Sequence, residues 1–347
     1  GLQTQLTEAQ EGTELAEARL HELQDTVPQL DESRRLAQHT LNQDSARQAE
    51  LSARLDALRT LQDKVRTDGK LVPWKDAKIH VLTHGLHYGS CVFEGERAYD
   101  GVIYKGTEHS QRFHKSAEIM DFTIPWSVAE LDAAKELCLR ENGLKDAYIR
   151  PVAWRGSEMM AVSGINNTIH TAIAVWEWPS MFDMAQKLKG VRLDVAAYRR
   201  PDPACAPVHA KAAGLYMICS LSKHKAERAG YADAMMLDWE GNVAECTGAN
   251  IFFIKDGVIH TPLADRFLNG ITRQSVIDLC RRRGFEVVER RIRPEELEGF
   301  SECFITGSAA EVTLVSEIGP YSFLTGNMGK VIMEDYSDAV RPKSKAA

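Results

Sequence analysis

One lysine stands apart from the other basic residues because its neighbours are small, apolar or neutral. Lys211 lies in VHAKAAGLY, and no charged residue occurs between Ala212 and Ile218. An ammonium group among small residues loses hydration, and its pKa falls toward neutrality. A lysine of lowered pKa can act as a nucleophile and as a base, so Lys211 is the first candidate for chemistry.

Six further segments combine glycine or small residues with one or two reactive side chains, as expected where backbone approaches a ligand closely. In chain order they are HYGSCVFEGERAY (87–99), HSQRFHKSA (109–117), DAYIRPVAWRG (146–156), NVAECTGANIFFI (242–254), NGITRQSV (269–276) and TGSAAEV (306–312). We expect these segments to form one site with Lys211.

Composition restricts the kinds of partner. The 347 residues are 44% hydrophobic and 26% charged, with a net charge of −7 and no long basic run. This balance argues against nucleic acid or an anionic membrane and favours small-molecule partners. The seven cysteines form no CxxC pair, so neither a disulfide framework nor a zinc site is indicated. No leader-like segment or long apolar run occurs. We expect mostly buried thiols in a reducing cytoplasm and no metal.

The first 70 residues differ from the rest. They contain no Trp, Tyr, Phe or Cys, and apolar residues recur at four-three spacing, which predicts a helical coiled-coil arm over residues 1–68, bent near Pro28. The arm fits two arrangements equally: pairing with a helix of its own chain, or an intermolecular coiled coil. The seam positions are Leu2, Leu6, Ala9, Thr13, Ala16, Leu20, Leu23, Val27, Leu30, Leu41, Leu51, Leu55, Leu58 and Val65.

From Leu71 onward, short β-branched or aromatic runs alternate with amphipathic stretches. HTAIAVWEW and NIFFIKDGVIHT are typical of strands, whereas SVAELDAAKELCLRENG and TRQSVIDLCRRRG are typical of helices. The alternation predicts a mixed α/β (α+β) fold. We expect a small domain at 69–178, an interdomain loop at 179–190, and a large domain at 191–347.

Over residues 69–340, VFEGERAY, AKAAGLY, NVAECTGANIFF, GITR and GSAAEVT together resemble the branched-chain amino-acid aminotransferases, enzymes of pyridoxal-phosphate fold type IV. The arm resembles the coiled coil of a bacterial chromosome-partition ATPase of the structural-maintenance type. That second resemblance covers residues 1–71 without an ATP-binding motif, so it implies a fused structural arm and no activity.

The aminotransferase resemblance implies pyridoxal 5′-phosphate as cofactor, bound covalently by Lys211, which then serves as the base at the substrate Cα. Glu245 would face the pyridine nitrogen, and Tyr216 would hydrogen-bond the ring hydroxyl. Arg112 would provide a forked contact to the phosphate. The start of the helix predicted after Asn269 would add backbone N–H groups. The remaining cofactor-binding candidates are Gly270, Ile271, Thr272 and Ser308.

The resemblance also implies a pocket that accepts an aliphatic side chain and the γ-carboxylate of glutamate in turn. Aromatic side chains would form its walls, while Arg97 and the backbone of the GSAAE turn would recognise carboxylates, with Arg150 in support. The substrate-binding candidates are Tyr88, Phe93, Arg97, Tyr148, Trp178, Ala309 and Ala310.

The implied activity is transfer of the amino group of L-leucine, L-isoleucine or L-valine to 2-oxoglutarate by a ping-pong cycle. The family's site borrows a loop from a second subunit, which implies a homodimer or a multiple of dimers. Three departures stand out: the arm replaces the family's first strand, Met181 replaces a frequent tyrosine, and Glu96 replaces an apolar residue.

Two alternatives stay open. One is another fold-type-IV enzyme: a D-amino-acid or R-amine aminotransferase, or an aminodeoxychorismate lyase. The other is a coiled-coil interaction protein that carries an inactive enzyme half. The hand of the accepted amine separates the enzymes, and truncation of residues 1–68 tests the interaction protein.

Overall fold

The structure, a computed structural model, describes residues 13, 19–20, 24, 26–28, 30–45, 47–48, 65–178 and 184–341. The chain divides into two compact units, Gly1–Leu61 and Gln62–Ala347. Met181 lies outside the described residues, as do several predicted seam positions of the arm.

The described residues of the first unit are helical, including the stretch 30–45. Their large apolar side chains, among them Leu30 and Leu41, are exposed. The coiled-coil pairing of this segment stays a prediction.

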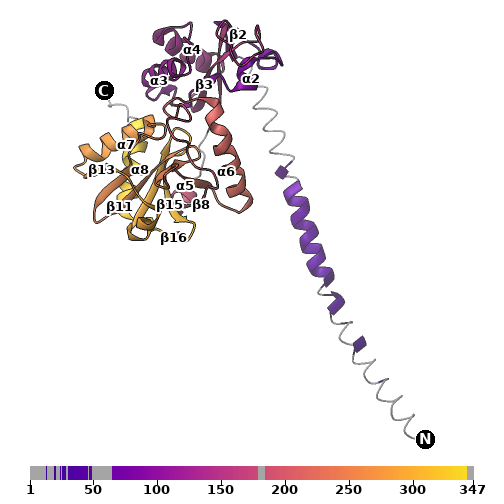
Figure 1. Cartoon of the computed structure of the whole chain (residues 1–347). Helices are drawn as coiled ribbons and strands as arrows, with labels where there is room; N and C mark the ends of the chain where they lie inside the picture. Colours follow the sequence, from indigo (N-terminus) through magenta and orange to yellow (C-terminus); the bar gives the residue numbers. More distant parts are fainter. Residues whose placement is uncertain are drawn as a thin grey trace, which may run out of the picture. The chain divides into compact units, whose positions relative to one another are not determined.

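The second unit contains two lobes, each built on its own sheet (Figure 1). In the first lobe the order β2-β1-β7-β6-β4-β5 joins strands that all pair antiparallel, with β3 also paired to β6. The helices α3 and α4 pack on this sheet. The strand bounds are β1 Val65–Thr67, β2 Lys70–Val72, β3 Cys91–Phe93, β4 Glu96–Tyr99, β5 Val102–Ile103, β6 Ala147–Arg155 and β7 Ile169–Glu177; the helices are η1 Trp74–Asp76, α2 His84–Tyr88, α3 Gly106–Ile119 and α4 Val128–Glu141.

Local sequence explains the start of α4. The Ser127 hydroxyl accepts a hydrogen bond from Glu130 N, and the Glu130 carboxylate accepts one from Ser127 N. This capping box satisfies two backbone donors that would otherwise have no partner. The amphipathic stretch predicted here is therefore confirmed as a helix.

The second lobe has the strand order β10-β9-β8-β15-β14-β11-β12-β13, with β16 beside β15. The pairs β8–β9, β8–β15 and β12–β13 are parallel, and the rest are antiparallel. The strand bounds are β8 Val191–Val195, β9 Asp233–Leu237, β10 Val243–Cys246, β11 Asn250–Lys255, β12 Val258–Pro262, β13 Val287–Arg290, β14 Glu302–Gly307, β15 Glu311–Ile318 and β16 Tyr321–Ser322; the helices are α5 Met184–Lys189, η2 Ala213–Leu215, α6 Tyr216–Arg228, α7 Ile271–Arg282, η3 Pro294–Gly299 and α8 Asn327–Val340.

The central strand β11 is buried on both faces. Ile251 and Phe253 belong to one core cluster, whereas Phe252 and Ile254 belong to another that includes residues of α7 and α8. Successive side chains of a strand point to opposite faces, so the apolar run NIFFI is required by its central place in the sheet. This double burial makes the lobe a rigid platform for the residues at its strand ends.

The expectation that the arm replaces the first strand is wrong. Val65–Thr67 forms β1, which pairs with β2 and also with β7. The turn between β1 and β2 is Asp68-Gly69, and both residues have positive φ, 46° and 83°. Asp-Gly is a preferred two-residue hairpin turn because it tolerates this conformation. The first lobe therefore has a strand between β2 and β7, and residues 65–67 belong to its sheet and not to the arm.

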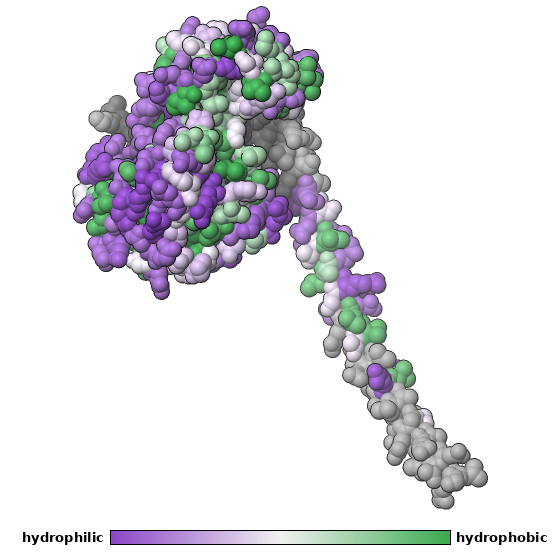
Figure 2. Space-filling view, in the orientation of Figure 1, coloured by the Kyte–Doolittle hydropathy of each residue, from purple (hydrophilic) through white to green (hydrophobic). Residues whose placement is uncertain are grey.

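Exposed apolar side chains gather on the segment from η1 to α2. Trp74, Ile79, Val81 and Leu86 are each at least half exposed, and Figure 2 shows apolar patches on this lobe. Within the described residues, no helix has both the length and the apolar character needed to cross a bilayer. All seven cysteines are free thiols and five are buried, as predicted.

Candidate active site

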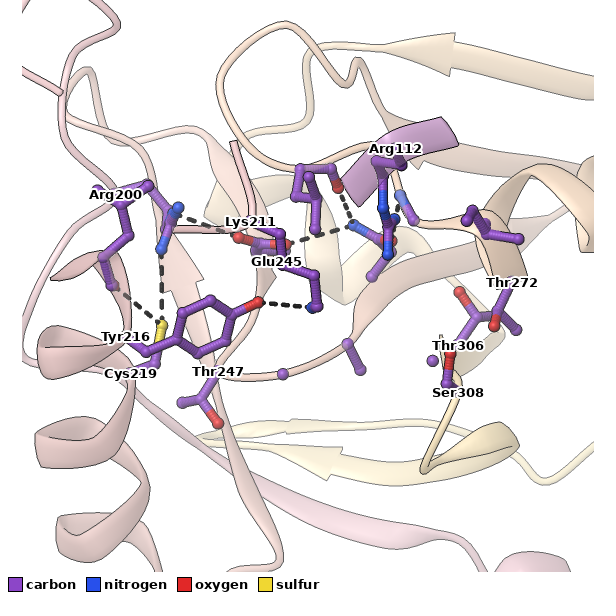
Figure 3. A pocket seen from close by; sticks show the side chains of 18 of the residues that line it. Arg112, Arg200, Lys211, Tyr216, Cys219, Glu245, Thr247, Thr272, Thr306 and Ser308 are labelled. Carbon is purple, nitrogen blue, oxygen red and sulfur yellow. Dashed lines mark hydrogen bonds and ion pairs between the residues drawn. The ribbon is translucent and has the colours of Figure 1, made fainter. Parts of the chain in front are cut away.

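A pocket between the two lobes gathers the predicted cofactor-binding residues. Its walls come from α3 of the first lobe and, in the second lobe, from the Lys211 segment, α6, β10, the start of α7 and the end of β14 (Figure 3). The predicted residues that line it are Arg112, Lys211, Tyr216, Glu245, Gly270, Ile271, Thr272 and Ser308. Segments far apart in sequence thus meet at one place.

Lys211 lies at the centre of this pocket. Its Nζ donates a hydrogen bond of 2.9 Å to the Tyr216 hydroxyl, and it lies 4.9 Å from the centre of the Phe93 ring. Burial and the nearby positive charge of Arg112 lower the pKa of Lys211. This direction agrees with the expectation from its small neighbours, and it favours the neutral amine more than for an exposed lysine.

Glu245 occupies one end of the pocket beside Arg200. Arg200 Nε lies 3.2 Å from Glu245 Oε1, and Arg200 Nη1 donates to Cys219 Sγ at 3.5 Å. Burial raises the pKa of Glu245 to about 7, while Arg200 and Lys211 oppose the rise. A carboxylate with this pKa can pair with a protonated pyridine nitrogen, whose own positive charge would favour the ionised form.

The opposite end is suited to an anion. In Figure 3, Thr272, Thr306 and Ser308 lie on the side away from Arg200. The helix α7 begins at Ile271 with Gly270 as its N-cap, as predicted, so its first N–H groups and its dipole favour negative charge there. This end has the donors that a phosphate requires.

Asn250 fixes the chain at the start of α7. Its Oδ1 accepts a hydrogen bond from Gly270 N at 3.1 Å, and its Nδ2 donates to Leu268 O at 3.1 Å. A Cβ at position 270 would lie 2.2 Å from Asn250 Oδ1. Glycine is therefore required at 270 by this close approach.

Arg112 also belongs to the anion-binding end, but its predicted fork is occupied. Its Nε and Nη2 donate to the two carboxylate oxygens of Glu94 at 2.8 and 2.7 Å. Among the described residues, Nη1 is buried and has no hydrogen-bond partner. An external anion would therefore meet one Nη1 group rather than the fork.

Of the predicted aromatic substrate residues, Phe93 lies beside the lysine, while Tyr148 and Trp178 pack against each other. The Phe93 ring lies 4.8 Å from that of Tyr216, and Tyr148 packs against Trp178 with ring centres 5.4 Å apart. Arg150 lies 4.5 Å from the centre of the Phe93 ring and donates to the Tyr148 hydroxyl at 3.1 Å. Arg150 therefore contacts two of the predicted substrate residues, and its supporting role in substrate binding stays a prediction.

None of the seven substrate candidates belongs to the lining of the pocket that contains Lys211. Arg97 is buried, donates to Trp178 O at 3.0 Å and lies 3.8 Å from Glu311. Ala310 is buried, Ala309 is partly buried, and Tyr88 is 47% exposed on α2. Their roles in substrate binding stay predictions.

Five polar residues of the site are not among the candidates predicted from the sequence: Glu94, Arg200, Thr247, Asn250 and Thr306. Glu94 follows the apolar residues Val92 and Phe93, and an acid next to a buried strand is a usable signal because it requires a partner. Arg200, Thr247 and Asn250 pair with groups distant in sequence, which no local pattern reveals. Thr306 Oγ1 is buried and has no hydrogen-bond partner among the described residues.

The part of the chain that contains the site also matches a known protein family. The family described as class IV amino-transferase matches residues 91–318. The chain belongs to this family. Class IV aminotransferases similar to it include the probable branched-chain-amino-acid aminotransferase of Rickettsia felis, 44% identical over 80% of this chain and 92% of that protein. The branched-chain-amino-acid aminotransferase of Pseudomonas aeruginosa is 41% identical over 80% of this chain and 93% of that protein.

Solved structures of branched-chain aminotransferases have the same fold. The enzyme from the archaeon Thermoproteus uzoniensis, solved with norvaline, gives a TM-score of 0.78 at 36% identity, covering 81% of this chain and 96% of that one. The Escherichia coli enzyme gives 0.78 at 35% identity, covering 82% and 98%. The predicted α/β fold type IV is thereby confirmed for the part of the chain that they cover.

Proposed function

We propose that this class IV aminotransferase is a branched-chain-amino-acid aminotransferase with pyridoxal 5′-phosphate as its cofactor. The observation that carries the proposal is the placement of Lys211 between Glu245 and an anion-binding end formed by α7, Thr272 and Ser308. A phosphorylated pyridine aldehyde needs these three features: an amine, a carboxylate for the ring nitrogen, and donors for the phosphate. The residues present fit the cofactor.

The chain's own residues then divide the work. When bound, the cofactor supplies an electron sink that stabilises negative charge at the substrate Cα. Lys211 Nζ, with its lowered pKa, removes and returns the proton at Cα. Glu245 holds the ring nitrogen in its protonated form, and Tyr216 orients Lys211 through their 2.9 Å hydrogen bond.

Phe93 supports branched-chain substrates, because its ring provides apolar surface 4.9 Å from Lys211 Nζ. Tyr148 and Trp178 are proposed to extend this apolar surface, since Arg150 contacts both Phe93 and Tyr148. L-Leucine, L-isoleucine and L-valine would donate the amino group, and 2-oxoglutarate would accept it. Arg97 and the backbone of Ala309 and Ala310 are proposed to recognise the substrate carboxylates.

Turnover with amines of both hands tests this function. We expect the protein with pyridoxal phosphate to form glutamate from L-leucine and 2-oxoglutarate, and Lys211→Ala to form none. Activity confined to D-leucine or an R-amine would instead assign the chain to another fold-type-IV reaction. No turnover with any amine would favour the interaction protein.

We also propose a homodimer in which each site borrows Tyr88 from the second subunit. The exposed apolar segment from Trp74 to Leu86 supports an interface, because a large exposed apolar patch is unfavourable in water. Tyr88 ends α2, next to this segment. A second copy packed on this segment would lie next to Tyr88. Tyr88 would then contribute to the site of that second copy rather than to the site of its own chain.

Mixing two inactive variants tests the borrowed residue. If Tyr88 acts across the interface, a dimer of one Lys211→Ala and one Tyr88→Ala subunit has one intact site. Equal mixing with random reassociation would then restore about a quarter of the wild-type sites. If Tyr88 acts within its own subunit, mixing restores none.

The helical arm is proposed to add to assembly through its exposed leucines, such as Leu30 and Leu41. Removal of residues 1–61, the whole first unit, should change the number of subunits, obtained from the light-scattering mass divided by the mass of one chain, but leave turnover unchanged. An unchanged number of subunits would favour an arm without a role in assembly. The free thiols fit the proposed cytoplasmic location.

A further inference from the structure

Glu94 is a buried acid that the proposed chemistry does not use. Its side chain is fully buried just after β3. It accepts hydrogen bonds from Arg112 Nε at 2.8 Å and Arg112 Nη2 at 2.7 Å, and His109 Nδ1 lies 2.6 Å from its Oε2. We infer that Glu94 is a positioning residue for the phosphate of the cofactor, acting by fixing the guanidinium of Arg112. This inference rests on the proposed use of pyridoxal phosphate.

The bidentate pair determines which atom of Arg112 reaches the pocket. Two parallel hydrogen bonds fix both the plane and the direction of a guanidinium. With Nε and Nη2 held by Glu94, Nη1 is the nitrogen without a partner among the described residues. Arg112 lines the pocket that also contains Thr272 and Ser308. Glu94 thus converts a flexible side chain into a fixed donor at the anion-binding end.

The same part of the fold holds Lys211. Phe93 N donates to Lys211 O at 3.1 Å, and Lys211 N donates to Ser116 Oγ at 3.0 Å. Phe93 is the neighbour of Glu94, while Ser116 lies one helical turn after Arg112 on α3. By fixing Arg112, Glu94 therefore also fixes the distance between the donor for the phosphate and Lys211. These two residues would hold opposite ends of pyridoxal phosphate.

The protonation states agree with this role. Burial alone would raise the pKa of Glu94, but Arg112 and His109 outweigh it and hold that pKa well below its usual range. The carboxylate is therefore ionised and only accepts hydrogen bonds, so His109 Nδ1 is the protonated ring nitrogen. The backbone N–H of Gly95 also donates to Glu94 Oε2, at 3.3 Å, so all four atoms that hydrogen-bond to this carboxylate are donors. A glutamine amide would place an N–H₂ group against at least one of them and break the fork.

The negative charge of Glu94 and its positioning of Arg112 have opposite effects on phosphate binding, which makes the inference testable. An ionised Glu94 repels a phosphate, so removing its charge would strengthen phosphate binding if Arg112 stayed in place. If Glu94 acts by positioning Arg112, Glu94→Gln should instead weaken phosphate binding, because it releases the guanidinium from its fixed plane. Affinity for pyridoxal phosphate relative to pyridoxal, which lacks the phosphate, separates the two effects.

Four forms of the cofactor-free protein decide the question: wild type, Glu94→Gln, Arg112→Met and the double variant. We expect Glu94→Gln to weaken binding of pyridoxal phosphate about tenfold or more and that of pyridoxal less than about twofold. The double variant should match Arg112→Met, since Glu94 acts through Arg112. Absorbance titration measures each dissociation constant.

Glu96→Gln is the matched control. Glu96 lies two residues away, is equally buried and pairs with Lys135 at 2.9 Å, away from the pocket lining. It should leave the ratio of the two affinities unchanged. If Glu94→Gln does not fold, Glu94→Asp replaces it, with a smaller change of the same sign expected.

Three results would overturn the inference while wild type binds pyridoxal phosphate: an unchanged ratio in the Glu94 variant, a ratio shifted toward pyridoxal phosphate, or additive effects in the double variant. Failure of the wild type to bind pyridoxal phosphate would instead refute the proposed function.

Discussion

Replacement of Arg200 by methionine tests how the charge of Glu245 is maintained. Arg200 and Glu245 form an ion pair at 3.2 Å, with 4% and 12% of their side chains exposed. Burial raises the pKa of Glu245 to about 7 even with Arg200 and Lys211 opposing the rise. Without Arg200, that pKa must rise further.

The size of the rise follows from the distance. Two unit charges 3.2 Å apart attract by about 5 kcal/mol at an effective dielectric constant of about 20. Water entering beside methionine and the cost of burying Arg200 reduce the net effect to roughly half. About 2.7 kcal/mol corresponds to about two pKa units. At pH 8, the ionised fraction of Glu245 would fall from about nine-tenths to about one-tenth.

The dependence of kcat on pH is the assay. Because the ionised form of Glu245 keeps the ring nitrogen protonated, Arg200→Met should lower kcat about tenfold at pH 8. The rise of kcat on the acidic side of the profile should move up by about two pH units. Activity should recover at higher pH, where Glu245 ionises again in the variant.

Arg199→Met is the control for Arg200→Met. Arg199 is the exposed neighbour of Arg200 and donates to Trp239 O at 3.1 Å, so its replacement should leave the profile in place. Arg200 does not maintain the charge of Glu245 if the acidic side of the Arg200→Met profile coincides with that of Arg199→Met, or if it moves to lower pH.

Three further changes have specific outcomes. Gly270→Ala places a Cβ 2.2 Å from Asn250 Oδ1, so the dissociation constant of pyridoxal phosphate should rise about tenfold; an unchanged constant would contradict the proposed role of this turn. Gly95→Ala places a Cβ 2.0 Å from the Tyr148 hydroxyl. It should raise KM for leucine by a larger factor than it raises the dissociation constant of pyridoxal phosphate. Equal factors would contradict the proposed place of Tyr148 in the substrate pocket. Burial raises the pKa of Glu96 to about 8, so the folded state keeps a proton that the unfolded state releases above about pH 4.5, and stability falls as pH rises from about 5 to 8. Urea unfolding of Glu96→Gln should lack this fall, and retention of the wild-type slope would contradict the assignment.

Residues whose chemistry depends on a local motif could be predicted from the sequence. Lys211 was identified by its small neighbours, and the N-terminus of α7 by glycine before an amphipathic run; both occur as expected. The resemblance to a known family added Glu245 and Tyr216, which a single sequence cannot place near a lysine.

Pairings between distant segments could not be predicted. Glu94 meets Arg112 across 18 residues and Arg200 meets Glu245 across 45, and nothing in either segment specifies its partner. The strand β1 was missed because three residues, Val65–Thr67, are too few for a recognisable alternation and follow a heptad pattern. The role of Glu96 was equally hidden, since Lys135 approaches it from α4.

The absorption spectrum of the protein with pyridoxal phosphate tests the central claim most directly. The spectrum is recorded alone, after addition of L-leucine, and again after addition of 2-oxoglutarate. The account predicts that the yellow band of the lysine-bound cofactor disappears with L-leucine and returns with 2-oxoglutarate. A band that responds only to a D-amino acid or an R-amine, or no band at all, would contradict it.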